Sequence, residues 1–198
     1  YEVAIFTNRF SSLQLQDSKI PSLELETNQA TGTCDVVSYS SNHQDQFSNL
    51  PQERIELIIH ALSNRTQELF ENPNIKYILP FENKGKEIGV TLEHPHGQIY
   101  SFGHIPEIIK KQSISQQGKP LENYLSNIPE ELILKKNSTG ICFVPRWARY
   151  PFEIWVVPYR RVPDLYSLSD DEKKDLAELM LVASKKLEGV FDTPMPYT

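Results

Sequence analysis

Cysteine is scarce in this chain, and so are the features that mark membrane or nucleic-acid-binding proteins. Its 198 residues include only Cys34 and Cys142, which lie too far apart to suggest a metal-binding pair. We interpret both as buried free thiols in a reducing cytoplasm. No apolar run approaches the roughly eighteen residues that span a bilayer. The net charge of −6 argues against a nucleic-acid surface. We therefore expect no membrane and no nucleic acid as partners.

The sequence also lacks an initiator methionine and a signal peptide. Residue 1 is Tyr, so we expect the chain to begin inside a longer protein. Hydrophobic residues make up 39% and charged residues 23%, which is typical of a globular protein. A nucleotide substrate stays compatible with the negative charge because it needs only local positive potential. Arg9, Lys84 and Lys86 are the candidates for supplying it.

What the chain does contain is a polar motif in residues 89–100, G-V-T-L-E-H-P-H-G-Q-I-Y. Three polar side chains recur there with a period of two: His94, His96 and Gln98. In an extended segment they share one face, while Ile99 on the other face anchors the strand in the core. Pro95 has no amide hydrogen and Gly97 no side chain, so we expect this strand at a sheet edge or beside a ligand. The pattern is more typical of a site than of a packing surface.

Histidine gives this motif its chemistry. Its unperturbed pKa of about 6.5 leaves much of it neutral and nucleophilic at physiological pH. A neutral imidazole attacks phosphorus and forms a covalent intermediate, which divides one difficult displacement into two easier ones. Gln98 has no charge but donates a hydrogen bond to a phosphoryl oxygen. Glutamine, unlike a third histidine, cannot protonate a leaving group, and this favours group transfer over hydrolysis.

The remaining patterns predict an α+β protein. β-Branched and aromatic runs predict strands at 2–8, 32–40, 75–82, 91–102, 142–144 and 151–157. Helical spacing of apolar residues predicts a helix at 51–70, with Asn49 and Gln52 resembling its start. Residues 11–30 read as a surface loop with one short strand, and 121–125 as a short helix within a polar connector.

A strand–turn–helix unit occurs twice, beginning at Val36 and again at Trp155. The second helix has Ser169 and Glu172 as a capping box, followed by an apolar face. Two copies of one unit predict a duplicated domain. The second copy stops at Thr198, before any counterpart of the histidine-bearing strand, so we expect it to be incomplete here.

Residues 81–100, F-E-N-K-G-K-E-I-G-V-T-L-E-H-P-H-G-Q-I-Y, resemble the active-site segment of the galactose-1-phosphate uridylyltransferases of the histidine-triad superfamily. The resemblance implies tandem histidine-triad-like domains, each an antiparallel sheet with flanking helices, in a cytoplasmic homodimer. On this basis we expect a catalytic domain at 1–108, a connector at 109–135 and a partial second domain at 136–198.

The same resemblance implies a reaction. The family exchanges UMP between UDP-glucose and galactose 1-phosphate, a step of galactose metabolism. His96 would be the nucleophile that attacks the α-phosphorus and forms a uridylyl-histidine, and Gln98 would hold the phosphoryl oxygens. Other positions match the family's substrate-binding segments: Asn8, Arg9, Phe10, Val36, Asn83, Gly89 and Thr91. Many relatives have Asp where Arg9 stands.

The resemblance also implies a metal site. Many relatives bind a structural zinc through two cysteines and two histidines, and His43 and His94 match the two histidines. Two imidazoles supply half of a tetrahedral shell, and we expect the cysteines before Tyr1. Some relatives have a second, iron-type site, which we do not expect here. Gln112 stands near the place of its acidic ligand, and no histidine follows His104.

Two alternatives stay open at this point. One is a nucleotide-sugar or dinucleoside-polyphosphate phosphorylase, which uses the same histidine with phosphate as the acceptor; a preference for adenine over uridine would indicate it. The other is a nucleotide-binding fragment without turnover, because the sugar-contacting residues would lie beyond Thr198.

Overall fold

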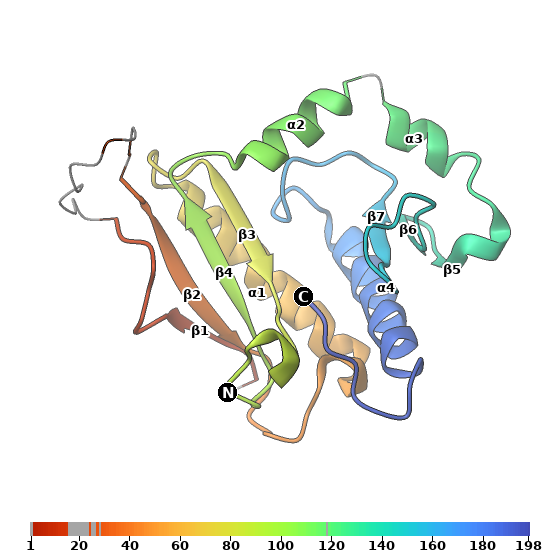
Figure 1. The fold of residues 1–198 in the computed structure, drawn as a ribbon, viewed down its shortest axis with the longest axis horizontal. Coiled ribbons are helices and arrows are strands. Elements are labelled where there is room, and N and C mark those ends of the chain that lie inside the picture. The colour runs from red at the N-terminus through yellow and green to blue at the C-terminus, as the bar shows by residue number, and fades with distance from the viewer. Residues whose placement is uncertain (1, 16–23, 25–26, 28, 118) are drawn as a thin grey trace.

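The structure, a computed structural model, describes residues 2–15, 24, 27, 29–117 and 119–198 (Figure 1). Two antiparallel sheets lie on the outside, and helices α1 (Gln52–Phe70) and α4 (Asp170–Glu188) pack against each other between them. Helices α2 (Glu107–Ser115) and α3 (Pro120–Leu125) connect the two halves above this layer. The α+β fold class predicted from the sequence is confirmed.

The first sheet has the order β1–β2–β4–β3, and every neighbouring pair is antiparallel. Its strands are β1 (Ala4–Thr7), β2 (Gly32–Ser38), β3 (Tyr77–Phe81) and β4 (His96–Phe102). One face lies on α1: Val37 of β2 and Ile99 of β4 meet Ile55, Ile58 and Ile59 of the helix, and each of these side chains is at most 2% exposed. Burying one such side chain stabilises the fold by about 1.5–3 kcal/mol. The opposite face carries the polar motif.

The second sheet has the order β5–β6–β7 and packs against α4. Its strands are β5 (Ile133–Lys136), β6 (Gly140–Phe143) and β7 (Trp155–Pro158). The described residues also form three short 3-10 helices: η1 (Phe47–Asn49), η2 (Lys86–Ile88) and η3 (Glu130–Leu132). Sequence reasoning missed α2 and β5, while the short helix expected at 121–125 is present as α3.

The two long helices begin in different ways. At α4 the predicted capping box is present: the Ser169 hydroxyl accepts the Glu172 amide at 3.2 Å, and the Glu172 carboxylate accepts the Ser169 amide at 2.8 Å. At α1 the expected cap is wrong, because Asn49 instead ends η1, and Pro51 stands before the first helical residue without a side-chain cap. Proline's fixed φ suits this position.

The polar motif also departs from prediction. Strand β4 begins at His96 rather than at residue 91, so His94 precedes it. The strand is internal and pairs with both β2 and β3, so an edge position is wrong. Pro95 removes no ladder bond because it lies outside the strand. Packing explains the glycine at position 97 instead, because a Cβ there would lie 2.0 Å from the Tyr39 hydroxyl.

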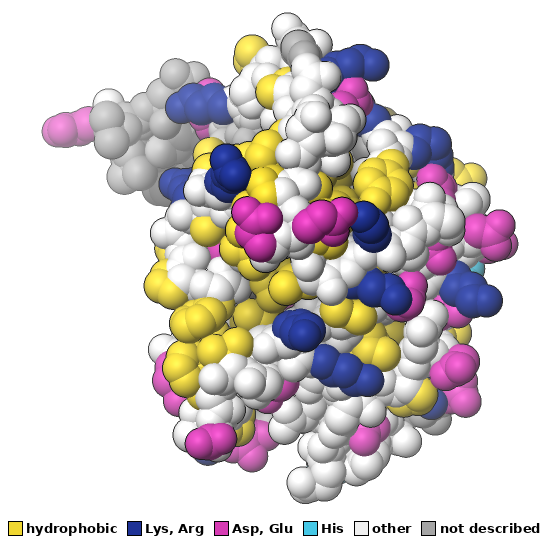
Figure 2. All heavy atoms as spheres, turned by 90° about the vertical axis from the view of Figure 1, so that its right-hand side faces the viewer, with side chains coloured by type: hydrophobic (Ala, Val, Ile, Leu, Met, Phe, Trp, Pro, Cys, Tyr) yellow, Lys and Arg dark blue, Asp and Glu magenta, His cyan; other side chains and the backbone are white. Residues whose placement is uncertain are grey.

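Figure 2 shows the face formed by the second half of the chain, where basic and acidic side chains alternate around hydrophobic patches. Within the described part of the chain, no helix combines the length and apolar character needed to cross a bilayer. Most of the loop expected at 11–30 lies outside the described residues, apart from a bridge between Gln14 and Thr31.

Candidate active site

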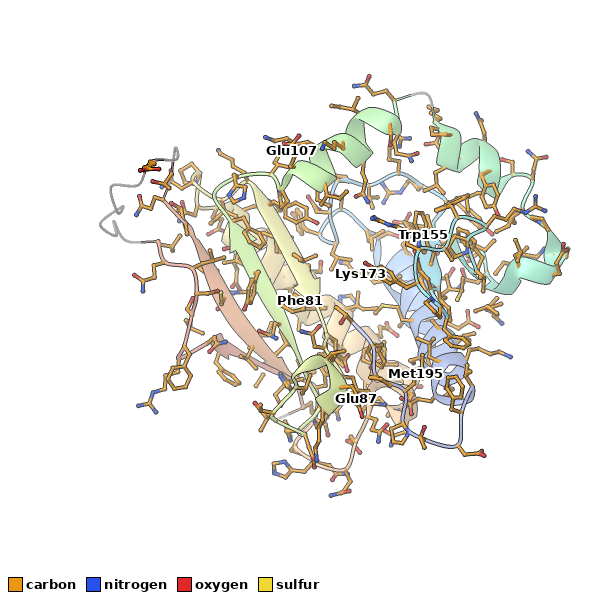
Figure 3. All side chains as sticks on the ribbon, in the orientation of Figure 1. Phe81, Glu87, Glu107, Trp155, Lys173 and Met195 are labelled. Atoms are coloured by element: carbon orange, nitrogen blue, oxygen red, sulfur yellow. The ribbon has the colours of Figure 1, made fainter. Side chains whose placement is uncertain are left out.

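A cavity of about 760 Å³ opens where β4 begins. This volume is typical of a small-molecule pocket. Four segments line it, drawn from residues 43–47, 82–87, 90–96 and 193–196. Figure 3 labels Glu87, from the η2 turn, and Met195, from the C-terminal segment, which both contribute to this lining. The polar motif and the segment that follows α4 therefore line the same cavity.

His96 lines the cavity with a defined tautomer. Its Nδ1 lies 2.8 Å from the backbone carbonyl oxygen of His94. A carbonyl oxygen only accepts, so Nδ1 carries the proton and donates it. The lone pair of the neutral ring is then on Nε2, which is the nitrogen available to attack an electrophile.

Gln98 lies two residues along β4, on the same face as His96. The strand register places it in a row across the sheet with Phe6 of β1, Val36 of β2 and Phe81 of β3. Directly opposite residues have their Cβ atoms about 5 Å apart. The structure thus brings Val36 next to Gln98 and gives this row an apolar surface around one amide. Neither residue lines the cavity itself.

Asn8, Arg9 and Phe10 follow β1, two strands away from β4, which is about 10 Å. The Asn8 side-chain oxygen accepts the Phe10 amide at 2.9 Å, and the Arg9 guanidinium lies 5.9 Å from the centre of the Phe10 ring. Phe10 is 84% exposed. These three residues follow the edge strand of the sheet and do not line the cavity.

Asn83 lines the cavity, and its Oδ1 atom is buried without a hydrogen-bond partner among the described residues. A buried acceptor of this kind is suited to a hydroxyl donated by a ligand. Gly89 ends η2 in the left-handed region, with φ at 86°. Gly89 and Thr91 are exposed and are not among the residues that line the cavity.

The lysines near the cavity are already paired. Lys84 binds the carboxylate of Glu188 and donates to Gln46 at 2.9 Å, and Lys86 lies 2.7 Å from Glu93. Both therefore supply less positive potential than the sequence suggests. The exposed Lys86–Glu93 pair joins η2 to the residue before His94.

His43 and His94 converge beside the cavity. Their Nδ1 atoms are 2.8 Å apart and their rings meet edge to face, with centroids 4.5 Å apart. The His94 Nε2 atom lies 2.9 Å from the Ser38 hydroxyl. Two nitrogens bound to one tetrahedral zinc would be about 3.3 Å apart, so this pair nearly fits. Among the described residues, however, no group of three or more His, Cys, Asp or Glu gathers around a common point. The pair alone does not fit a complete zinc site.

Sequence reasoning missed a second set of residues behind β4. The Glu82 carboxylate accepts the Tyr197 hydroxyl at 2.8 Å and is also hydrogen-bonded to Tyr39. Burial raises the pKa of Glu82 to about 7, although these two hydroxyls and the Lys84 charge act in the opposite direction. Tyr197 is 115 residues away from Glu82, and no periodicity in the sequence indicates the pairing.

Comparison with known proteins places this chain in a family. The N-terminal domain of the family "Galactose-1-phosphate uridyl transferase" matches residues 1–106, and its C-terminal domain matches residues 112–198. The chain belongs to this family of uridylyltransferases.

Individual relatives agree with this assignment. The galactose-1-phosphate uridylyltransferase of Thermotoga maritima is 32% identical over the whole chain, and that of Streptomyces lividans 31%. A solved uridylyltransferase superposes with a TM-score of 0.89 at 30% identity, covering 99% of this chain and 66% of that one. An ADP-glucose phosphorylase from Arabidopsis thaliana, at 22% identity and a TM-score of 0.82 over 98% of this chain and 65% of that one, shares the fold. The chain spans 65% and 55% of the length of the two curated relatives.

Proposed function

We propose that this protein transfers uridylyl groups between UDP-glucose and galactose 1-phosphate through a covalent intermediate on His96. One observation carries the proposal: the hydrogen bond from Nδ1 to the His94 carbonyl leaves the Nε2 lone pair free at the cavity. We infer the two substrates from the family to which the chain belongs.

The first half-reaction exchanges one bond for another. The Nε2 lone pair attacks the α-phosphorus of UDP-glucose, and the bond from that phosphorus to the bridging oxygen breaks. Glucose 1-phosphate leaves with the bonding electrons, and uridylyl-histidine remains. The ring becomes cationic in this step, and the His94 carbonyl, which already accepts the Nδ1 proton, stabilises it.

The second half-reaction restores the enzyme. A phosphate oxygen of galactose 1-phosphate attacks the same phosphorus, the P–N bond breaks, and His96 recovers its lone pair as UDP-galactose forms. The Gln98 amide donates to the non-bridging oxygens in both directions. The apolar row of Phe6, Val36 and Phe81 beside it suits a nucleoside, and the free Asn83 oxygen suits a ribose hydroxyl.

A phosphorylase is the second candidate. The related fold of an ADP-glucose phosphorylase shows that this architecture accommodates that chemistry in another protein. Intact-protein mass spectrometry of the full-length protein separates the two. We expect one uridylyl group on the wild type after UDP-glucose, none on His96→Ala, and release by galactose 1-phosphate.

The control is His104→Ala, which removes an exposed histidine whose ring contacts only Phe102 among the described aromatics. This variant should label as the wild type does. An adenylyl adduct from ADP-glucose, released by inorganic phosphate, would instead establish the phosphorylase. No adduct from either donor in folded protein would leave a nucleotide-binding module without turnover.

We extend the proposal to a zinc ion, a cytoplasmic location and a homodimer. A zinc ion held partly by His43 and His94, with two thiolates from elsewhere in the protein, would join the loop before β4 to residues 43–47. The supporting observation is the 2.8 Å convergence of their Nδ1 atoms. Elemental analysis should give one zinc per chain, reduced in His43→Ala. Since the described residues supply only half of its shell, no step above depends on it.

We also propose that the protein lies in the cytoplasm and forms a homodimer. Both cysteines are buried and unpaired, which suits a reducing compartment. Cell fractionation tests the location. Light scattering on the full-length protein tests the dimer, and a single-chain mass at micromolar concentration would contradict it.

A further inference from the structure

The side chain of Tyr39 passes directly behind the catalytic strand. Tyr39 follows β2, is 5% exposed, and packs edge to face on Phe47 with ring centroids 5.7 Å apart. Its hydroxyl occupies the space in which a side chain on Gly97 would stand, 2.0 Å from the Cβ position. Its amide donates to the carbonyl of Pro95 at 3.1 Å. Tyr39 therefore contacts the backbone on both sides of His96.

The Tyr39 hydroxyl is held in turn from behind. It is hydrogen-bonded to the Glu82 carboxylate, whose Oε1 also accepts the Tyr197 hydroxyl at 2.8 Å. Glu82 follows β3 directly, and Tyr197 belongs to the segment after α4. Three distant segments thus meet at one carboxylate.

The C-terminal segment is fixed independently of that carboxylate. Tyr197 and Lys84 exchange two backbone hydrogen bonds of 2.8 and 2.9 Å, and the Lys84 ammonium lies 5.6 Å from the centre of the Tyr197 ring. Lys84 also binds Glu188 at the end of α4. The support behind Tyr39 is therefore anchored in both halves of the chain.

We propose that Tyr39 is a positioning residue for the transfer reaction: its hydroxyl, held by Glu82 and Tyr197, fixes the backbone of Gly97 and so the placement of His96 and Gln98 on the opposite face. This inference rests on the proposed function above. It extends that function to Tyr39, which neither lines the cavity nor touches the reacting atoms.

The physical reason is the location of Gly97. It is the residue between the nucleophile and the amide that holds the phosphoryl group, so a shift of its backbone moves both. A misplacement of about 1 Å can cost on the order of a hundredfold in rate while contacts to the rest of the substrate persist. The loss should therefore appear in the chemical step and not in nucleotide affinity.

The test is single-turnover labelling of the full-length protein by UDP-glucose, with the donor's dissociation constant measured separately by calorimetry on His96→Ala backgrounds. We expect Tyr39→Phe to slow labelling at saturating donor by about tenfold or more while affinity changes less than about twofold. Tyr197→Phe, one contact further away, should slow it less. Tyr150→Phe, which removes a hydroxyl from a 70% exposed side chain, is the matched control and should label at the wild-type rate.

The outcomes are distinguishable. Unchanged labelling by Tyr39→Phe would overturn this inference while leaving the transferase intact, and so would a loss that lies entirely in donor affinity. A wild type that never labels would overturn both together. If Tyr39→Phe folds poorly, Glu82→Gln provides the second variant, and it must show the same slow labelling with unchanged affinity.

Discussion

The Nδ1 atom of His96 lies 2.8 Å from the carbonyl oxygen of His94, two residues earlier in the chain. Pro95 stands between them and restricts the backbone to a narrow range of φ. The tautomer of His96 is thus set by a backbone atom that no side-chain substitution removes. In metal sites and catalytic triads the same task is given to a carboxylate or a backbone carbonyl.

This contact predicts the position of the covalent bond. The uridylyl group should be attached to Nε2 of His96, because Nδ1 is protonated and faces its own backbone. Phosphorus–nitrogen NMR correlation on the trapped intermediate, made with labelled histidine, distinguishes the two ring nitrogens. An adduct on Nδ1 would contradict the assigned tautomer. An adduct on another histidine would contradict the proposal that His96 is the nucleophile.

A second prediction concerns the ion pair beneath the sheet. Asp35 of β2 is 1% exposed, and its Oδ2 accepts the Arg65 guanidinium of α1 at 2.8 Å. Arg65→Ala leaves a buried carboxylate without its partner, so we expect the free energy of unfolding to fall by about 3 kcal/mol. Urea denaturation measures it. The control is Lys136→Ala, which breaks the exposed pair with Glu130 and should change stability little. Equal effects of both substitutions would refute the buried pair's importance.

A third prediction follows from Glu82. Burial raises its pKa to about 7 in the folded state, above the ordinary value of 4.5. The folded state therefore favours the neutral acid. Its contribution to stability is complete below about pH 4.5 and is lost as pH rises through about 7. The hydroxyls of Tyr39 and Tyr197 stay protonated in this range, because burial raises their pKa values too.

The measurement is the difference in unfolding free energy between the wild type and Glu82→Gln at several pH values. The wild type should lose up to about 3 kcal/mol relative to the variant between pH 5 and pH 8. Taking the difference removes the shared titration of the histidines. A flat difference, or a wild type that gains stability over the variant as pH rises, would show that Glu82 is ionised throughout.

The sequence was informative wherever one face of an element is buried. The periodicity of Ile55, Ile58 and Ile59 predicted α1, and the alternation around Ile99 predicted which face of β4 enters the core; the structure confirms both. The signal weakens where polar residues continue an extended pattern past the end of a strand. That is why β4 was expected to include His94, although its ladder begins only at His96.

Contacts between distant segments could not be predicted in this way. Nothing in the sequence around Tyr197 indicates that its hydroxyl reaches Glu82, since a single hydrogen bond between irregular segments leaves no periodic pattern. The pairing of Lys84 with Glu188 is of the same kind. Gly97 is the instructive case: its missing side chain suggested an edge or a ligand, whereas the space is filled by Tyr39.

That packing gives the last prediction. A methyl group on Gly97 would lie 2.0 Å from the Tyr39 hydroxyl, 2.9 Å from its Cζ and 3.0 Å from the carbonyl of Phe81. We expect Gly97→Ala to lower the free energy of unfolding by about 3 kcal/mol, as overpacking of a core does. Tyr39→Phe removes the nearest of these atoms, so the double variant should recover about 1 kcal/mol relative to additivity.

Gly89→Ala is the control for this cycle. It also substitutes a glycine of the motif, and its φ of 86° strains any side chain, but nothing lies within 4 Å of the added Cβ. Its cost, about 1 kcal/mol, should not change when Tyr39 becomes Phe. Since the two glycines differ in whether they contact Tyr39, coupling at Gly97 alone would show that the hydroxyl and the catalytic strand share one space. Strict additivity at both glycines would place Tyr39 elsewhere and remove the physical basis for its positioning role.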